Sequence, residues 1–205
     1  MKEPIFIKDF LPPQLLTVVQ TYCLMKYAHK KKFHMYEDKQ CEVLVDEYSD
    51  PLMETILDLS TSVIEQNLGK KLFPVNSFFR IYDKGSDLPV HTDRDSCEYT
   101  VAFCIGCDPI DKPYEIFIGE KDETSDYKYV DKFGTLQRLK INYKFPMLPN
   151  SALLFQGVNT NHWREKCEHD NFISVFFHYV EQEGKFSHYK YDKRSSLGFK
   201  PNDAP

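Results

Sequence analysis

Two short stretches decide the fold that the sequence predicts. The longer one reads Gly157-Val158-Asn159-Thr160-Asn161-His162-Trp163-Arg164-Glu165, and the shorter one reads His91-Thr92-Asp93. In a β-strand, residues i and i+2 point to the same side, so His91 and Asp93 can bind one metal ion. His162 must then arrive on a different strand of a closed or sandwiched sheet. Two histidines and one carboxylate are the ligands of a facial iron(II) site, which leaves the opposite face of the ion open.

The composition is that of a globular protein. The chain has 205 residues, 41% of them hydrophobic and 15% aromatic, which fits one domain with a sizeable core. The formal net charge of -5 argues against a general nucleic-acid partner, although a local basic groove remains possible. No stretch is apolar for long enough to form a signal peptide or to span a membrane, so a cytoplasmic location is expected.

Six cysteines are present, and without an export signal reduced thiols are expected. Cys104 and Cys107 form a CxxC pair, which raises zinc binding or redox chemistry as an alternative. No second CxxC or histidine pair lies at zinc-finger spacing, and Cys104 sits in an apolar, strand-like run. We therefore expect buried, unreactive side chains here.

Two helices are expected in the first third of the chain. Apolar residues recur at helical spacing over 14–29, where the stripe consists of Leu16, Val19, Cys23 and Tyr27. The run Lys30-Lys31-Lys32 fits a solvated helix end better than a nucleic-acid contact. Asp50-Pro51 then predicts the start of a helix over 51–68, which Gly69 closes. Its expected stripe is Leu52, Ile56, Leu59 and Val63, and both helices are expected to pack on one sheet.

From residue 73 the pattern alternates with period two, which is typical of strands. Strands are expected at 4–7, 75–82, 88–93, 97–106, 114–118, 136–143, 151–156 and 172–180. Residues 119–135 are expected to form a charged loop, either a substrate lid or a solvated connection. The sequence thus predicts one domain over 1–205, with helical support in 1–72, a core in 73–182 and a tail in 183–205. The predicted fold is mainly β with N-terminal helices (α+β), an antiparallel double-stranded β-helix, or cupin-like jelly roll.

The spacing of the motifs is similar to that of a known family. Tyr82 precedes His91 with a turn at Gly85 between them, and His162 follows far downstream after a strand and the Gly157 turn. Residues 74–180 resemble the iron(II)- and 2-oxoglutarate-dependent oxygenases, in particular the prolyl-4-hydroxylase-like branch. The runs His162-Trp163-Arg164-Glu165 and Phe176-Phe177-His178-Tyr179 resemble short microbial and viral members of that branch.

This resemblance implies that His91, Asp93 and His162 are the catalytic iron ligands. It also implies that 2-oxoglutarate and O2 are co-substrates, that succinate and carbon dioxide are released, and that a substrate is hydroxylated. A peptidyl residue such as proline, or a small metabolite, is the implied substrate, because fold and ligands do not set its identity. The alternative is a non-catalytic jelly roll that binds a metal or another ligand. The oligomeric state is left open.

The family usually holds the far carboxylate of 2-oxoglutarate with a basic residue at the start of its last strand. Phe172 stands at the matching position, and only Ser174 fits the common Arg-x-Ser pattern. An arginine fork suits a carboxylate well, so Arg164 is the first candidate to replace that residue. Tyr82 and Ser174 are expected to support it, and Arg80 is held in reserve.

Neighbouring residues carry weaker signals. For Arg164 and Arg80, the alternative role is a structural ion pair, for instance with Glu98 or Glu165. Arg94 is expected near the entrance to the site, because it should point away from the iron. Trp163 is expected to face the opposite way from the ligands and to lie in the core, and His178 is expected to be a satisfied core histidine.

Overall fold

The computed structural model describes residues 3–33, 41, 45–130 and 134–199, and it leaves the side chains of residues 30–33 undescribed. The strands are β1 (Ile5–Ile7), β2 (Val45–Tyr48), β3 (Leu72–Tyr82), β4 (Leu88–His91), β5 (Tyr99–Asp108), β6 (Tyr114–Lys121), β7 (Lys128–Val130), β8 (Leu136–Met147), β9 (Ser151–Phe155), β10 (Asn161–Arg164) and β11 (Asn171–Glu181). The helices are α1 (Pro13–Phe33) and α2 (Pro51–Leu68), with short 3-10 turns η1 (Gly157–Asn159) and η2 (Ser187–Lys193).

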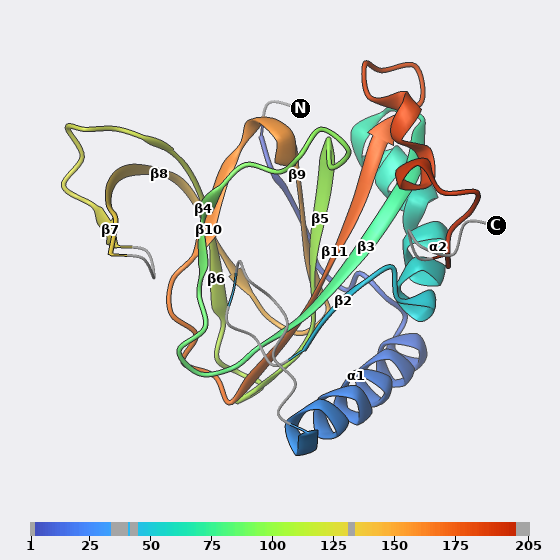
Figure 1. The fold of residues 1–205 in the computed structure, drawn as a ribbon, viewed down its shortest axis with the longest axis horizontal. Coiled ribbons are helices and arrows are strands. Elements are labelled where there is room, and N and C mark those ends of the chain that lie inside the picture. Colours follow the sequence, from blue (N-terminus) through green and yellow to red (C-terminus); the bar gives the residue numbers. More distant parts are fainter. Residues whose placement is uncertain (1–2, 34–40, 42–44, 131–133, 200–205) are drawn as a thin grey trace.

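Within these residues the strands form two antiparallel sheets, as the alternating pattern predicted. One has the order β1-β9-β5-β11-β3-β2 and the other the order β4-β10-β6-β8-β7. Both helices lie against the outer face of the first sheet, while the second sheet curls away from its inner face (Figure 1). The predicted double-stranded β-helix with N-terminal helices is therefore confirmed.

Helix α2 has the bounds that its local signals predicted. The side chain of Asp50 accepts hydrogen bonds from the backbone N–H groups of residues 52 and 53, and Gly69 ends the helix at φ 66°. The predicted buried stripe was wrong in part, because Leu59 and Val63 are exposed. The buried face is turned toward neighbouring positions such as Ile56 and Leu57, which pack on the sheet.

Helix α1 is about one turn longer than predicted. Val19 and Cys23 are fully buried against the sheet, and Leu16 and Tyr27 pack beside them, as the stripe predicted. The expectation for Lys30-Lys31-Lys32 concerns side chains that lie outside the described residues.

Strand ends differ from the predicted ones where pairing partners decide them. Residues 119–135 were expected to form a loop, but β6 continues to Lys121 because β8 offers a partner strand, and β7 pairs with β8 in turn. Strand β8 also continues through Pro146, beyond the strand end predicted at residue 143. Among the described strands, only β6 pairs with β8 at Pro146, so the proline lies at an edge of the sheet, where proline is tolerated. The lid role proposed for 119–135 stays a prediction.

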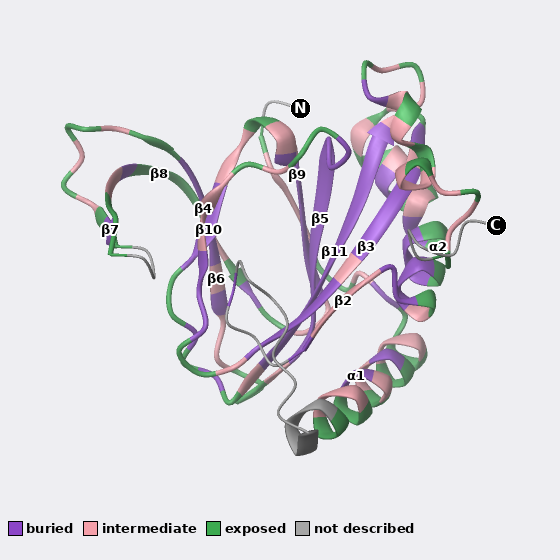
Figure 2. Ribbon diagram, viewed as in Figure 1, coloured by how far each residue is buried: buried purple, intermediate pink, exposed green. Residues whose placement is uncertain are grey.

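Alternation along the strands divides the core into two layers. The strands β3, β5 and β11, which are buried along most of their length (Figure 2), contribute to both. In β3, Phe79 and Ile81 face the helices, whereas Tyr82 faces the space between the two sheets. In β11, Phe172 and Phe176 likewise face that space. The inner layer is thus lined by side chains of both sheets. The predicted 2-oxoglutarate contacts Tyr82 and Arg164 also point into this layer.

All six cysteines lie among the described residues and are free thiols, as expected. Cys104 is fully buried, as predicted for the CxxC pair, and Cys107 is partly exposed. None of the helices in the described part of the chain is both long and apolar enough to cross a membrane.

Candidate functional site

Two neighbouring strands bring the predicted histidines together. His91 is the last residue of β4, and His162 is the second residue of β10. The two are direct partners in the antiparallel ladder, and their ring centroids lie 4.2 Å apart. His162 is also packed edge-on against Phe155 at 4.7 Å and is almost completely buried.

Asp93 reaches the histidines in a different way from the one predicted. Strand β4 ends at His91, so Asp93 lies in the following loop and not on the same strand. Its backbone N–H donates to the carbonyl of Gly157 at 3.0 Å, and its Oδ2 accepts from the Thr100 hydroxyl at 2.6 Å. A Cβ on Gly157 would lie 2.1 Å from that Oδ2 atom. The glycine therefore leaves the room in which the carboxylate sits.

The three ligand atoms are close enough to share one ion. Oδ1 of Asp93 lies 3.6 Å from Nε2 of His91 and 3.6 Å from Nε2 of His162. Each distance is shorter than twice a metal–nitrogen bond of about 2.1 Å. All three ligand atoms lie within 4.8 Å of one another. Among the described residues, no other group of three potential ligands is this compact.

Backbone carbonyls select the tautomer of both histidines. Nδ1 of His91 lies 2.8 Å from the carbonyl oxygen of Pro89, and Nδ1 of His162 lies 2.9 Å from that of Thr160. A carbonyl oxygen can only accept, so each Nδ1 carries the proton and each Nε2 presents a lone pair. Metal-binding histidines are commonly oriented by such a second hydrogen bond.

The protonation states also suit a metal. Burial alone would raise the pKa of the Asp93 carboxyl, but His162, His91 and Thr100 outweigh it and hold that pKa below its ordinary value. Burial and, to a smaller extent, the neighbouring His91 lower the pKa of His162 to about 4. At neutral pH the group therefore consists of a carboxylate and a neutral imidazole, the forms in which these side chains bind metals.

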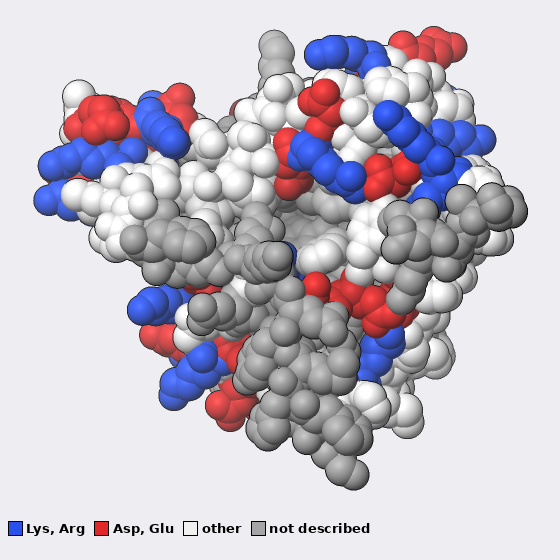
Figure 3. Space-filling model, viewed as in Figure 1, with Lys and Arg blue, Asp and Glu red and all other residues white. Residues whose placement is uncertain are grey.

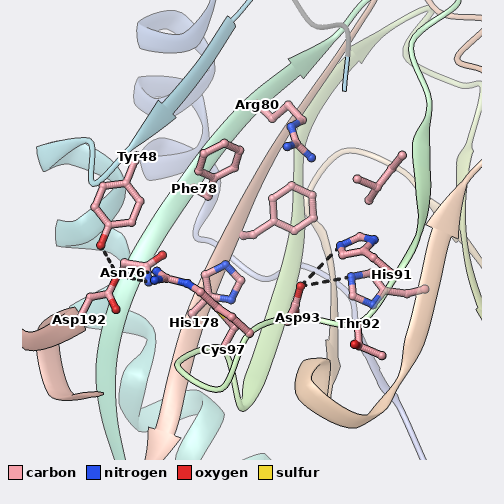
Figure 4. A pocket seen from close by; sticks show the side chains of 14 residues that line it. Tyr48, Asn76, Phe78, Arg80, His91, Thr92, Asp93, Cys97, His178 and Asp192 are labelled. Carbon is pink, nitrogen blue, oxygen red and sulfur yellow. Dashed lines mark hydrogen bonds and ion pairs between the residues drawn. The ribbon is translucent and has the colours of Figure 1, made fainter. Parts of the chain in front are cut away.

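A pocket of about 560 Å³ opens beside these ligands. This volume is within the range of small-molecule sites. Acidic and basic side chains surround a hollow near the middle of the face shown in Figure 3. In the close view, Arg80 lies at one end of the pocket and Tyr48 and Asp192 at another, with Phe78 between them, and Asp93 points toward His91 (Figure 4).

Arg164, the predicted clamp, points from β10 into the inner layer and is completely buried. Its guanidinium carbon lies 4.8 Å from the ring centroid of Tyr114 and 4.9 Å from that of Phe172. Nη1 donates to the backbone carbonyls of Tyr114 at 2.8 Å and Glu115 at 3.2 Å. Nε and Nη2 are buried and have no hydrogen-bond partner in the described part of the chain. Buried donors without partners are costly, so this arrangement suits an anion that would accept from them.

Arg80 approaches the same region from β3. It lines the pocket, and its Nη1 donates to the hydroxyl of Tyr82 at 3.3 Å. The guanidinium carbons of Arg80 and Arg164 each lie 5.7 Å from the Tyr82 ring centroid. The structure thus brings both candidate cations to the same tyrosine.

The other predicted residues are placed as follows. The Ser174 hydroxyl donates to the carbonyl of Phe103 at 3.2 Å. Of the four residues predicted to contact 2-oxoglutarate, Arg80 lines the pocket, whereas Arg164, Tyr82 and Ser174 lie behind its wall. The alternative ion pairs of Arg164 are not formed: Glu98 accepts from a backbone N–H of β11, and Glu165 accepts from a tyrosine hydroxyl. Arg164 forms no ion pair with any described residue. The roles of these residues in binding a co-substrate stay predictions.

Trp163 is fully buried and stacks on Phe117 at 5.5 Å, so its predicted core position is confirmed. Arg94 lines the pocket, in keeping with a position near the entrance. His178 is buried but also lines the pocket, which the expectation of a plain core histidine missed. His178 follows Phe176 by two residues on β11, and residues at this spacing share a face of a strand. The sequence could therefore have shown that His178 points inward. Asp192 was missed as well, and the tail offers no pattern that would have revealed it.

No family model matches the sequence, and no curated protein is similar to it in sequence. Solved structures do match. A prolyl-4-hydroxylase from Pseudomonas putida has a TM-score of 0.56 and 12% identity over 87% of this chain and 92% of its own.

The viral collagen prolyl hydroxylase of Paramecium bursaria Chlorella virus-1, in its 2-oxoglutarate complex, has a TM-score of 0.54 and 11% identity over 87% of this chain and 96% of its own. The epimerase SnoN, in complex with Fe3+, alpha ketoglutarate and nogalamycin RO, has a TM-score of 0.56 and 9% identity over 87% of this chain and 78% of its own. The chain therefore has the fold of these enzymes, on a sequence that is 9–12% identical to theirs.

Proposed function

We propose that this protein is an iron(II)- and 2-oxoglutarate-dependent oxygenase that hydroxylates a peptidyl residue, such as proline, or a small metabolite. In this reaction one oxygen atom of O2 enters a C–H bond of the substrate. The other enters succinate as 2-oxoglutarate loses carbon dioxide. The observation that carries the proposal is the compact group of His91, Asp93 and His162 beside a pocket of about 560 Å³.

The donor set of this group fits iron(II). Two imidazole nitrogens and one carboxylate oxygen on one side of the ion leave its other side for small ligands. The carbonyl contacts of both Nδ1 atoms and the hydroxyl contact of Asp93 hold the three ligands in orientation before an ion arrives. When bound, iron and 2-oxoglutarate would supply the activation of dioxygen, and this chain would supply their positions.

The residues present also fit 2-oxoglutarate. Arg164 offers Nε and Nη2, two buried donors without partners, and a guanidinium fork suits a carboxylate. Its guanidinium stands beside the ring of Phe172, the residue at the position where the family resemblance calls for a cation. A cation from β10 would thus replace one from β11. Tyr82 lies between Arg164 and Arg80 and can donate its hydroxyl to the same carboxylate.

Apolar side chains also form part of the pocket wall. Phe78, Leu88 and Phe176 line it together with Arg80 and the ligands. Such walls exclude water from the reacting atoms and bind the carbon skeleton of a substrate. The viral prolyl hydroxylase and SnoN, which share this fold, are enzymes of different substrates and reactions. They support an oxygenase site without fixing its substrate.

The proposal is tested by anaerobic titration of the purified protein with iron(II) and then 2-oxoglutarate, followed by visible spectroscopy. We expect the metal-to-ligand charge-transfer band that appears when 2-oxoglutarate chelates iron(II) through its 2-oxo acid group. Asp93→Ala should abolish the band. Asp95→Ala, which removes an exposed carboxylate from the same loop, should leave it intact.

Two results would contradict the proposal. Iron binding without the band would mean that 2-oxoglutarate is not the co-substrate. No iron binding at all would favour the alternative of a non-catalytic jelly roll that binds another ligand. Succinate formed from 2-oxoglutarate in air, measured without added substrate, separates an active oxygenase from both.

A further inference from the structure

The pocket has a charged wall that the iron and 2-oxoglutarate do not need. Arg94 follows the ligand Asp93, and Asp192 lies in η2, after the last strand. The two side chains form an ion pair at the pocket although they are 98 residues apart in sequence. Figure 4 shows Asp192 on the far side of His178 from Asp93. The ion pair and the ligand group therefore line the same pocket.

Asp192 uses only one of its two oxygens. Tyr48, Asn76 and Arg94 all donate to Oδ2. No described residue donates to Oδ1, although the side chain is only 10% exposed. Oδ1 is thus an anionic acceptor held at the pocket with its position already set by three donors.

Arg94 likewise has donors to spare. A guanidinium carries five N–H groups, and the contacts of Arg94 within the described residues are with Asp192 and Cys97. Its side chain is 57% exposed, so the remaining N–H groups can reach a ligand. A free carboxylate acceptor and a free guanidinium donor therefore lie side by side.

His178 adds a second acceptor to this wall. The Thr100 hydroxyl donates its proton to Asp93 at 2.6 Å, so it accepts from Nδ1 of His178 at 3.2 Å. Nδ1 then carries the proton, and Nε2 presents a lone pair. No described residue donates to Nε2, and His178 lines the pocket.

The backbone holds Asp192 in an unfavourable conformation. Tyr191, Asp192 and Lys193 have φ angles of 54°, 55° and 63°, a left-handed run that costs free energy in residues other than glycine. Asp192 is not the sole anchor of this segment, because Arg194 also ties it to α2 through Glu54 at 2.6 Å and to β3 through the carbonyl of Val75 at 2.9 Å. Strain that persists beside a pocket is commonly tied to what the pocket binds.

We infer that the substrate is a free α-amino acid, held by its charged head group. Asp192 and His178 would accept from its ammonium group, and Arg94 would donate to its carboxylate. This inference rests on the proposed function and narrows its substrate. An ammonium ion alone would compete with Arg94 for the carboxylate of Asp192. A carboxylate alone would compete with Asp192 for the guanidinium of Arg94. A zwitterion satisfies both charges at once, whereas a residue inside a peptide carries neither.

The test starts from the anaerobic complex with iron(II) and 2-oxoglutarate. The twenty protein amino acids are added one at a time, and the shift of the charge-transfer band is measured as each binds. We expect at least one free amino acid to shift the band, and its N-acetyl amide to leave the band unchanged. Asp192→Asn and Arg94→Gln should each raise the half-saturating concentration at least about tenfold, because each removes a charge-assisted hydrogen bond. Asp95→Asn, the matched control on the exposed loop, should leave it unchanged.

The outcomes separate this inference from the proposed function. A band that forms but responds to no free amino acid overturns the amino-acid substrate and leaves the oxygenase standing. An equal response to the free and the blocked amino acid overturns it too, and this comparison needs no variant. Wild-type affinity in Asp192→Asn removes Asp192 from the head-group site. If no band forms, both proposals fail together.

Discussion

Replacing Arg164 with methionine should weaken 2-oxoglutarate binding and leave the metal-free protein at least as stable as before. The two effects have opposite signs because the same two donor atoms of Arg164 favour the binding of 2-oxoglutarate and disfavour the fold of the metal-free protein. Nε and Nη2 of Arg164 are buried without partners in the described part of the chain. They destabilise the metal-free protein, and they form favourable hydrogen bonds only when a carboxylate accepts from them.

The magnitude follows from these atoms. A hydrogen bond to a charged group contributes about 1.5–3 kcal/mol, so two such bonds contribute about 3 kcal/mol or more. At about 1.4 kcal/mol per factor of ten, the Kd for 2-oxoglutarate should rise more than about 100-fold. The variant also loses the two bonds that Nη1 makes to carbonyls, worth about 1 kcal/mol each. Relief of two unpaired buried donors, at about 1–3 kcal/mol each, offsets that loss or exceeds it.

Two assays measure the two effects. Titration of the iron complex gives the affinity for 2-oxoglutarate, and urea unfolding gives the free energy of unfolding of the metal-free protein. Arg138→Met is the control, because Arg138 lies on β8, does not line the pocket and, among the described residues, donates only to the carbonyl of Ser125 at 2.7 Å. Normal affinity for 2-oxoglutarate combined with a loss of stability would show that Arg164 has a structural role and does not bind 2-oxoglutarate. Arg80→Met would then test the remaining candidate.

Three further predictions concern the groups around the metal ligands. Gly157→Ala should lower iron(II) affinity at least about tenfold, measured by equilibrium titration, because its Cβ would lie 2.1 Å from Oδ2 of Asp93. Thr100→Val should lower iron(II) affinity by about 10-fold to 100-fold by removing the hydroxyl that donates to Asp93, and Thr100→Ser should restore it. Burial lowers the pKa of His162 and that of His178 to about 4, from 6.5. The unfolded chain therefore binds these protons first, so the stability of the metal-free protein should be full above pH 6.5. It should fall toward pH 4 by up to about 1.4 kcal/mol per pH unit for each histidine, as urea unfolding across that window can measure. A flat profile would mean that neither histidine is buried in its neutral form.

Local signals predicted local structure well. Helix α2 runs over the expected residues because Asp50 and Gly69 act through backbone contacts within one helical turn. Which face of that helix is buried depends on the sheet beneath it, and the spacing alone did not reveal it. Leu59 and Val63 are apolar yet exposed for that reason.

The candidate ligands could be found from spacing, but the way in which they meet could not. The prediction treated His91 and Asp93 as neighbours on one strand. In the structure β4 ends between them, and Gly157 from a distant segment holds the Asp93 backbone in place. Contacts between residues so far apart leave no periodic pattern, and the same holds for the pairing of Arg94 with Asp192.

The residues that line the pocket come from segments that tolerate substitution to different degrees. His162 lies on β10, which pairs with strands on both of its sides, so changes there disturb a whole ladder. Asp192 lies on η2, a short turn that follows the last strand and is fastened by Arg194. Residues 187–193 belong to neither sheet, so changes there leave the strand ladders intact. Directed evolution confined to this turn would alter which molecules enter the pocket and spare the ligands, so new specificities should arise there first.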